Sequence, residues 1–102
     1  MEIINGSPAS RGPAGSSTGS ITAQNTGITG IFVKGQFSID ISGTWVATVF
    51  LQRSYDGSNW RDVESYTANC ELTYEDKVGS TYRLFVKTGG YTSGTVVAAI
   101  RT

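Results

Sequence analysis

The sequence predicts an all-β protein, an antiparallel β-sandwich or jelly roll of about seven or eight strands with an extended N-terminal arm. Three observations lead to this fold class. Short segments of alternating apolar and polar residues recur along the chain, turn residues separate them at intervals of about ten residues, and no segment has a helical period. With 102 residues, the chain has an ordinary size for one sandwich domain.

The first part of the chain, residues 1–20, differs in composition from the rest. It holds both prolines, four glycines and five serines, with one apolar pair near its start. Such a segment buries too little apolar surface to offset its ordering entropy alone. We therefore predict an arm over residues 1–20 and a β-sandwich domain over residues 21–102. The arm is either a disordered tail or an extended segment that lies on a neighbouring subunit. In the second case, its contact residues are Ile3, Ile4, Pro8, Arg11 and Pro13.

Two short strands are predicted at the start of the domain, at residues 21–24 and 30–34, with turn residues between them. The next predicted strand, residues 36–41, alternates cleanly between apolar and polar residues, as expected for a strand with one buried face. Its inward-facing residues are Phe37, Ile39 and Ile41, and the bends on either side of it are predicted at Gly35 and Gly43.

Residues 43–66 contain the longest strand-like run, the strongest turn signal and both tryptophans, and we interpret them as a central β-hairpin. One face of its first strand carries Trp45, Ala47, Val49 and Leu51. The other face carries Phe50, so the strand is covered on both sides, either by its own domain or by a neighbour. Trp45 and Trp60 are both expected to supply core area.

The hairpin turn is predicted at Asp56-Gly57, because glycine adopts positive φ without strain and aspartate tolerates it. In the second strand, Trp60 and Val63 would fall on opposite faces of a regular strand. A β-bulge is therefore expected near Asp62.

Three more strands are predicted in the C-terminal part, with a polar turn at residues 75–80 and a loop at residues 88–94. Their inward-facing sets are Cys70, Leu72 and Tyr74, then Tyr82, Leu84 and Val86, then Val96, Ala98 and Ile100. Cys70 is the only cysteine, so no internal disulfide can form, and we interpret it as a small buried strand residue and not as a reactive thiol.

The charge composition argues against several classes of function. Eight Lys and Arg residues balance eight Asp and Glu residues, and only 16% of the chain is charged. This composition does not favour nucleic acid as a partner, and it suits contact with other proteins, because interface cores are depleted in charge. No signal-peptide pattern and no long apolar run occurs, so we expect no membrane partner and synthesis in a cytoplasm.

Catalysis has little support, because the chain contains no histidine. The commonest general base and metal ligand is therefore missing, together with every Ser-His or Cys-His nucleophile. Two carboxylate pairs remain, Asp56 with Asp62 and Glu75 with Asp76. In neither pair are the two carboxylates expected to face each other across a cleft, as a glycosidase would require. We predict no enzyme activity, no catalytic residue, no metal and no cofactor.

Three groups of residues allow two interpretations each. Asp56, with Ser58 and Asn59, is either a weak calcium ligand or an acceptor of N–H groups within its own turn, and we favour the turn. The larger groups are an aromatic set, either a sugar-binding platform or core and interface groups, and a basic set, either a binding stripe or a solvated sheet face. The aromatic set is Tyr55, Trp60, Tyr66, Tyr74 and Tyr91, and the basic set is Arg53, Arg61, Arg83 and Lys87.

About half of the chain, from residue 51 to residue 101, resembles small β-sandwich proteins encoded in the structural operons of tailed bacteriophages. In those proteins a strand ending in an LQRSxDG…W hairpin is followed by a YR strand and a terminal SGTV strand. The matching residues here are 51–57, Trp60, 82–83 and 93–96. The hairpin also resembles the Asp-box of sialidase-type propellers, S-x-D-x-G-x-x-W, but here glycine follows aspartate directly and the motif occurs once, so no propeller is implied.

The resemblance implies a virion component such as a capsid decoration (cement) protein, a head fibre or a tail-associated module. We expect a non-enzymatic decoration protein, made in the host cytoplasm, that binds the major capsid protein or other virion proteins as a homo-oligomer such as a trimer. Its sheet contacts are predicted at Phe50, Val97 and Ala99. The alternative is a tail or head–tail module that binds a host-surface glycan or another tail protein.

Overall fold

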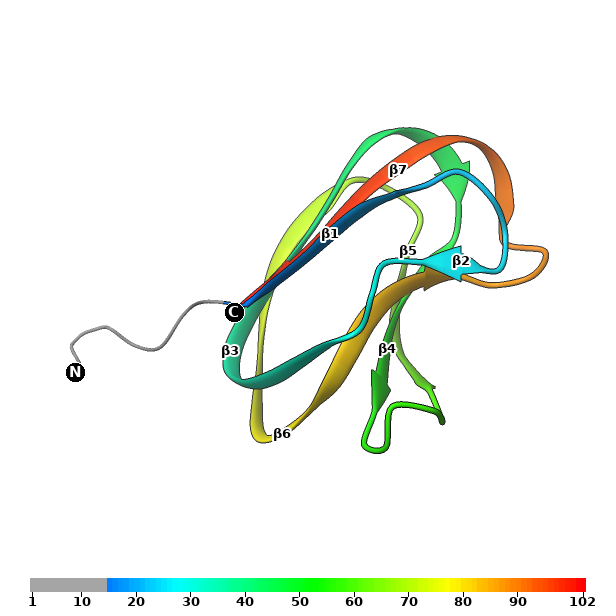
Figure 1. Cartoon of the computed structure of the whole chain (residues 1–102). Coiled ribbons are helices and arrows are strands. Elements are labelled where there is room, and N and C mark those ends of the chain that lie inside the picture. The colour runs from blue at the N-terminus through cyan, green and yellow to red at the C-terminus, as the bar shows by residue number, and fades with distance from the viewer. Residues whose placement is uncertain (1–14) are drawn as a thin grey trace.

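The computed structural model describes residues 15–102, which form one antiparallel sheet of seven strands (Figure 1). Among these residues there is no helix, and so none that could cross a membrane. The order in the sheet is β1-β7-β3-β6-β4-β5, and β2 pairs with β6. The strands are β1 (Ser16–Ile21), β2 (Thr26–Gly27), β3 (Ile31–Ala47), β4 (Val49–Ser54), β5 (Arg61–Tyr66), β6 (Cys70–Val86) and β7 (Tyr91–Arg101). The predicted all-β antiparallel class is confirmed.

The sheet curves over itself because its two longest strands, β3 and β6, belong to both of its halves. Each has 17 residues. The start of β3 pairs with the end of β6, Ile31 with Tyr82, and Ile41 later in β3 pairs with Cys70 at the start of β6. Strands β7 and β1 extend one half and β4 and β5 extend the other, and Figure 1 shows the halves curving around a shared interior. One hydrophobic cluster draws its buried residues from both halves.

The bend of β3 and β6 is a bulge in a region where the sequence predicted a turn. Residues 77–79 of β6 stand opposite a single residue of β3, Lys34. Gly79 within this bulge and Gly35 beside Lys34 have φ angles of +103° and +94°, a region that residues with side chains rarely adopt. The predicted polar turn at residues 75–80 is therefore wrong, because these residues form a bulge within one continuous strand.

The long strand predicted before the hairpin turn is divided at Thr48. Strand β3 ends at Ala47 and β4 begins at Val49, and the Thr48 N–H donates a hydrogen bond of 2.8 Å to the carbonyl of Gly90. The chain passes here from the half of the sheet that contains β7 to the half that contains β4 and β5. The predicted inner face is nevertheless confirmed, because Ala47, Val49 and Leu51 are buried.

The β-bulge predicted near Asp62 is confirmed. Leu51 of β4 pairs with Glu64 of β5, whereas Gln52 pairs with Asp62, so Val63 is an extra residue in β5. Because side chains alternate between the two faces of a strand, this single insertion changes which residues share a face toward the tip of the hairpin.

The two tryptophans do not share the role that the sequence predicted. Trp45 is half-buried and packs against the core cluster, and its Nε1–H donates to Asn69 Oδ1 at 2.7 Å. Trp60 is also half-buried, but it is outside that cluster and lies against Arg83. The prediction that Trp60 supplies core area is therefore wrong, because the ring packs on a residue that alternates with the buried residues of β6.

The ends and faces of the remaining strands follow the prediction in part. Strand β1 begins at Ser16, inside the segment predicted as the arm, and the strand predicted at residues 21–24 does not extend past Ile21.

Early in β6 the predicted inner face is partly open, since Leu72 is 41% exposed. Cys70 is half-buried against the core, and burial raises the pKa of its thiol. The predicted inner faces of late β6 and of β7 are confirmed by the burial of Tyr82, Leu84, Val86, Val96, Ala98 and Ile100.

Candidate functional site

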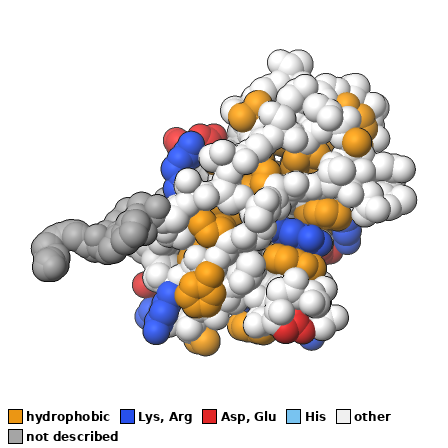
Figure 2. Space-filling model, in the orientation of Figure 1, with side chains coloured by type: hydrophobic (Ala, Val, Ile, Leu, Met, Phe, Trp, Pro, Cys, Tyr) orange, Lys and Arg blue, Asp and Glu red, His pale blue; other side chains and the backbone are white. Residues whose placement is uncertain are grey.

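Cationic and aromatic side chains from β4, from β6 and from the residues just before β5 and just after β6 stack outside the hydrophobic core. Arg83 lies between two rings, with its guanidinium carbon 4.1 Å from the ring centroids of both Trp60 and Phe85. Lys87 Nζ lies 4.3 Å from the ring centroid of Phe50. We call these five residues the outer ladder. Figure 2 shows Lys and Arg side chains between hydrophobic ones over the region of β2 and the β4–β5 hairpin. The cation–π contacts of Arg83 and Lys87 stabilise the packing of the outer ladder.

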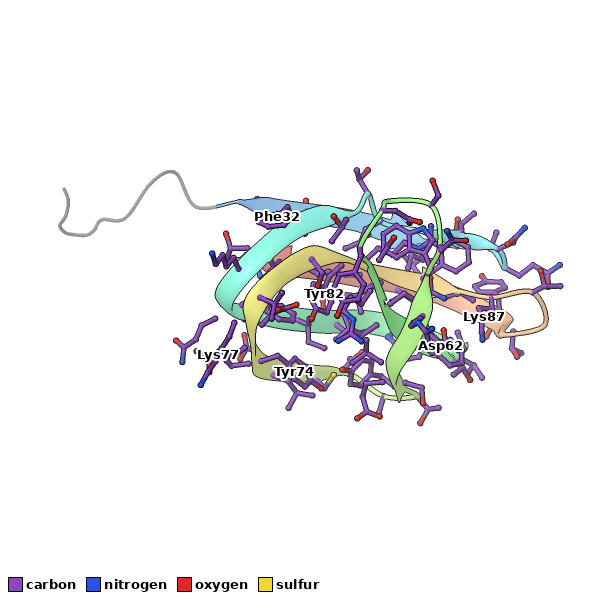
Figure 3. All side chains as sticks on the ribbon, turned by 90° about the horizontal axis from the view of Figure 1, so that it is seen from below. Phe32, Asp62, Tyr74, Lys77, Tyr82 and Lys87 are labelled. Carbon is purple, nitrogen blue, oxygen red and sulfur yellow. The ribbon has the colours of Figure 1, made fainter. Side chains whose placement is uncertain are left out.

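A chain of hydrogen bonds links the two cations of the outer ladder through side chains of β4 and β5. Arg83 Nε donates to Gln52 Oε1 (2.8 Å), Gln52 Nε2 donates to Asp62 Oδ1 (3.0 Å), and Lys87 Nζ donates to Asp62 Oδ2 (2.7 Å). Figure 3 shows Asp62 and Lys87 near one another, at the end of the sheet away from Lys77. The hydrogen bond from Lys87, followed by the one from Gln52, lowers the pKa of the Asp62 carboxyl. Two of the four predicted basic residues are therefore engaged within the fold.

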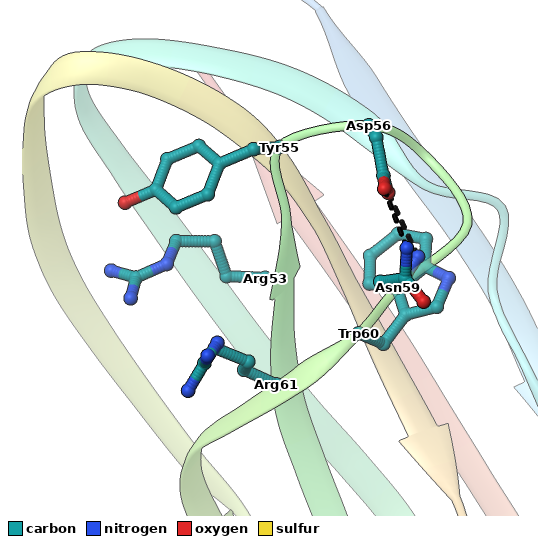
Figure 4. A pocket seen from close by; sticks show the side chains of 6 residues that line it. All are labelled: Arg53, Tyr55, Asp56, Asn59, Trp60 and Arg61. Atoms are coloured by element: carbon teal, nitrogen blue, oxygen red, sulfur yellow. Dashed lines mark hydrogen bonds between the residues drawn. The ribbon is translucent and has the colours of Figure 1, made fainter.

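The other two predicted basic residues, Arg53 and Arg61, line a hollow at the tip of the hairpin. Its volume is about 350 Å³. In Figure 4 the side chains of Arg53, Tyr55 and Arg61 extend to one side of the hairpin, and Trp60 lies on the other side. The residues lining this hairpin-tip hollow are Arg53, Tyr55, Asp56, Asn59, Trp60 and Arg61. The predicted basic set is therefore divided between two surfaces and does not form one stripe.

Asp56 organises the loop that closes the hairpin, residues 55–60. Its Oδ1 accepts the backbone N–H groups of Ser58 and Asn59, each at 2.8 Å, and its Oδ2 accepts Asn59 Nδ2 at 2.6 Å. These bonds, the one from the Asn59 backbone first, hold the pKa of the Asp56 carboxyl well below its usual range. The predicted turn role of Asp56 is confirmed. The turn is longer than predicted, and only Gly57 in it has positive φ, at +82°.

The structure does not bring together the predicted sheet contacts. Phe50 is half-buried beside Lys87 in the outer ladder, Val97 is 45% exposed, and Ala99 is only 6% exposed. Strands β3 and β6 separate β4, which carries Phe50, from β7, which carries the other two residues. The predicted arm contacts, Ile3, Ile4, Pro8, Arg11 and Pro13, lie outside the described residues.

The predicted aromatic set does not form one platform either. The hydroxyl groups of Tyr66 and Tyr74 are hydrogen-bonded to each other at 2.7 Å, and Tyr91 donates to the carbonyl of Gly94 at 2.8 Å. Only Tyr55, which is 71% exposed, and Trp60 share the hairpin-tip hollow. Three of the five aromatic residues therefore serve the fold at other places.

A surface that the sequence did not indicate lies at the bend of β3 and β6. Phe32 is 63% exposed and Val78 is 78% exposed. The ring of Phe32 lies over Gly79, where an added Cβ would come within 2.8 Å of the ring. We call Phe32 and Val78 the apolar corner. The sequence could not reveal it, because the pattern predicts a turn at Val78 and a short strand at Phe32, with no sign that the two residues lie near the same bend.

The candidate site is therefore a set of cationic and aromatic side chains on one face and at the hairpin tip of the sheet. No protein-family model, curated protein or solved structure matches this chain.

The carboxylates near these surfaces act as hydrogen-bond acceptors. The pKa values of Asp56, Asp62 and Asp76 are all lowered, so each carboxylate is ionised at neutral pH and cannot serve as a general acid there. Within residues 15–102, no group of three or more Cys, Asp or Glu residues is placed to hold a metal ion. What the arrangement offers is cationic, aromatic and apolar contact area.

Proposed function

We propose that this chain is a structural protein of a tailed-phage virion that decorates the capsid. In this role an oligomer of the domain binds the assembled head and stabilises it by burying surface between neighbouring subunits. The observation that carries the proposal is the apolar corner, two large apolar side chains exposed at one bend. A bend with exposed apolar groups suits burial against another protein, since the centres of interfaces are apolar and depleted in charge.

Two further observations support this proposal. The resemblance of residues 51–101 to phage structural proteins supplies the class of particle. The low charged fraction, 16%, and the formal net charge of zero suit a surface that stays in contact with protein. The predicted localisation in the virion and the capsid protein as partner are part of the same proposal.

The alternative is a tail or head–tail module that binds a host-surface glycan or another tail protein. The observation that favours it is the hairpin-tip hollow, where Tyr55 is exposed beside Trp60. This alternative predicts a glycan-array signal that is lost in the Trp60→Ala variant. Decoration of the head predicts no such signal.

Substitution of the apolar corner should weaken binding to heads that were assembled without the protein. We expect the double variant Phe32→Ser, Val78→Ser to bind such heads at least about tenfold more weakly in a cosedimentation assay, because a desolvated apolar contact is lost. Val46→Ser is the matched control, since Val46 is 58% exposed on a different part of β3. Equal binding by the double variant and the control would contradict the proposal.

Removal of the N-terminal arm tests its predicted contacts separately. Deletion of residues 1–14 leaves β1 in place, whereas deletion of residues 1–20 would remove most of the strand that pairs with β7. We expect the shorter deletion to keep the thermal unfolding midpoint of the domain and to lower its affinity for heads, because the contacts of Ile3 and Ile4 are lost. Undiminished affinity would show that the arm makes no contact of consequence.

A further inference from the structure

Two arginines stand directly opposite one another at the hairpin-tip hollow. Arg53 of β4 pairs with Arg61 of β5. Like charges at directly opposed positions of an antiparallel pair are destabilising, so this arrangement lowers the stability of the hairpin. A regular register, continued from the pair Leu51 and Glu64, would have placed Asp62 opposite Arg53. The extra residue at the β5 bulge exchanges that opposite-charge pair for a like-charge pair.

The described residues do not neutralise these two charges. The ion pairs among them join Lys87 to Asp62 and Arg101 to Asp40, and neither includes Arg53 or Arg61. The hollow also contains the ionised carboxylate of Asp56, but that carboxylate accepts the N–H groups of its own loop and forms no ion pair with either arginine, so one positive charge of the pair remains in excess.

Arg53 itself is held in place with an unused donor. Its Nε is buried and has no hydrogen-bond partner in the part of the chain that the structure describes, and an unsatisfied buried donor is costly. Its guanidinium carbon lies 5.3 Å from the ring centroid of Tyr55. Its pairing partner in β6, Tyr82, makes a side-chain hydrogen bond with Arg53 and donates its own hydroxyl to Asp76 at 2.8 Å, so Tyr82 brings no opposite charge to Arg53. The like-charge pair and the unsatisfied Nε break local rules of stability, as is expected at functional or strained sites.

We propose that the hairpin-tip hollow is a carboxylate-binding site, in which Arg53 and Arg61 receive an acidic side chain of a partner protein. This inference rests on the proposed function and names the chemistry of one of its contacts. Guanidinium groups suit the role because their planar N–H donors match the two oxygens of a carboxylate. Arginine is also among the residues that contribute most binding energy at protein interfaces.

Two observations favour a protein side chain over an acidic sugar. Sugar rings bind by stacking on aromatic faces, but Arg53 lies over Tyr55 and Arg83 lies over Trp60, which leaves less ring face for stacking. The hairpin loop also projects from the body of the sheet in Figure 1, where it can reach into the surface of a partner. The acidic sugar is therefore an outcome of the test.

The site can be tested on the isolated protein by NMR of the arginine side chains. A capped peptide with two glutamates is titrated, beside a matched glutamine peptide, glucuronic acid and inorganic phosphate. We expect the glutamate peptide to shift the Nε–H resonances of Arg53 and Arg61, and the glutamine peptide to leave them unchanged. Equal shifts with both peptides, or tighter binding of glucuronic acid or phosphate than of the glutamate peptide, would overturn the proposal.

Variants separate the forked geometry from charge alone. Arg61 is exposed on the edge strand β5, so Arg61→Gln should fold. Arg53→Lys should also fold, because it keeps the positive charge and removes only the forked guanidinium. Backbone amide spectra would verify the fold of both variants. Each is expected to weaken binding of the glutamate peptide at least about tenfold. Lys34 is an exposed cation on β3, so Lys34→Gln is the matched control. This control should not change the affinity for the glutamate peptide. Binding retained in both arginine variants would contradict the assignment.

The same variants distinguish this inference from the proposed function. If wild-type protein binds heads and Arg61→Gln binds them equally well, the carboxylate site is wrong while capsid decoration stands. If the glutamate peptide binds but no head does, the carboxylate site stands and the proposed function is wrong.

Discussion

The Gly94→Ala variant is expected to lose about 3 to 5 kcal/mol of unfolding free energy, or to fail to fold. Gly94 has a φ of +89°, which is strained for any other residue. An added Cβ would also come within 2.6 Å of the Cα of Trp45 and even closer to the carbonyl oxygen of Thr44. Both atoms are backbone of β3, the strand that pairs with β7, so neither can move without loss of the pairing. Urea unfolding followed by tryptophan fluorescence measures the loss.

Gly35→Ala is the matched control, because it separates the two causes. Gly35 has nearly the same φ, +94°, but no atom lies within 4 Å of where its Cβ would stand. Its substitution should cost only the conformational strain, about 1 to 2 kcal/mol. Equal losses in the two variants would mean that strain alone matters. A Gly94→Ala variant as stable as the wild type would contradict the close approach of β3 and β7.

The parts of the fold that could be predicted from the sequence are those set by local periodicity. In β7, Val96, Ala98 and Ile100 are buried as their alternation predicts, because period-two alternation needs no knowledge of the partner strand. The division at Thr48 could not be predicted, because the alternation of residues carries no information about which strand each half pairs with. Ala47 and Val49 remain in phase across the break, so the pattern of burial continues even though the strand does not.

The bulge in β6 was mistaken for a turn because both features use the same residues. A glycine with positive φ beside an aspartate that accepts N–H groups is typical of a hairpin turn, and Asp76 and Gly79 provide both features. What decides between a turn and a bulge is whether the chain reverses, and this depends on the pairing with β3, which lies some forty residues away in sequence.

The sequence identifies the residues of the candidate site but not how they are placed relative to one another. The basic set was evident in the sequence, yet its division depends on the register of β4 and β5. With a regular register Arg53 would face Asp62, and the hollow would be neutralised. The extra residue Val63 instead places Asp62 opposite Gln52, on the outer face, and Arg61 opposite Arg53. A bulge was expected there, but its exact register follows from pairing and not from composition.

The Asp76→Ala variant is expected to lose about 2 to 4 kcal/mol of unfolding free energy. The Asp76 carboxylate accepts four hydrogen bonds in the bulge of β6, two from backbone N–H groups and two from the hydroxyls of Ser80 (2.6 Å) and Tyr82 (2.8 Å). These hydroxyl residues are only 3% and 4% exposed, so their donors would be left without a partner and without free access to water. Glu75→Ala is the control, since it removes the same charge from the exposed neighbouring position. A similar loss in both variants would assign the effect to charge and not to the hydrogen bonds.

The contribution of Asp76 should also depend on pH in one direction. The hydrogen bonds from Ser80 and the Gly79 backbone hold the pKa of its carboxyl well below the ordinary value. A group with a lowered folded-state pKa stabilises the fold fully above its unfolded pKa, about 4, and loses that contribution as the pH falls toward the folded value. The difference in unfolding free energy between wild type and Asp76→Asn should therefore be largest near neutral pH and shrink below about pH 4. Because Asp56 also has a lowered pKa, the Asp76→Asn variant should still lose some stability in acid. A difference in unfolding free energy between wild type and variant that stays constant down to about pH 2 would contradict a role for the ionised Asp76 carboxylate.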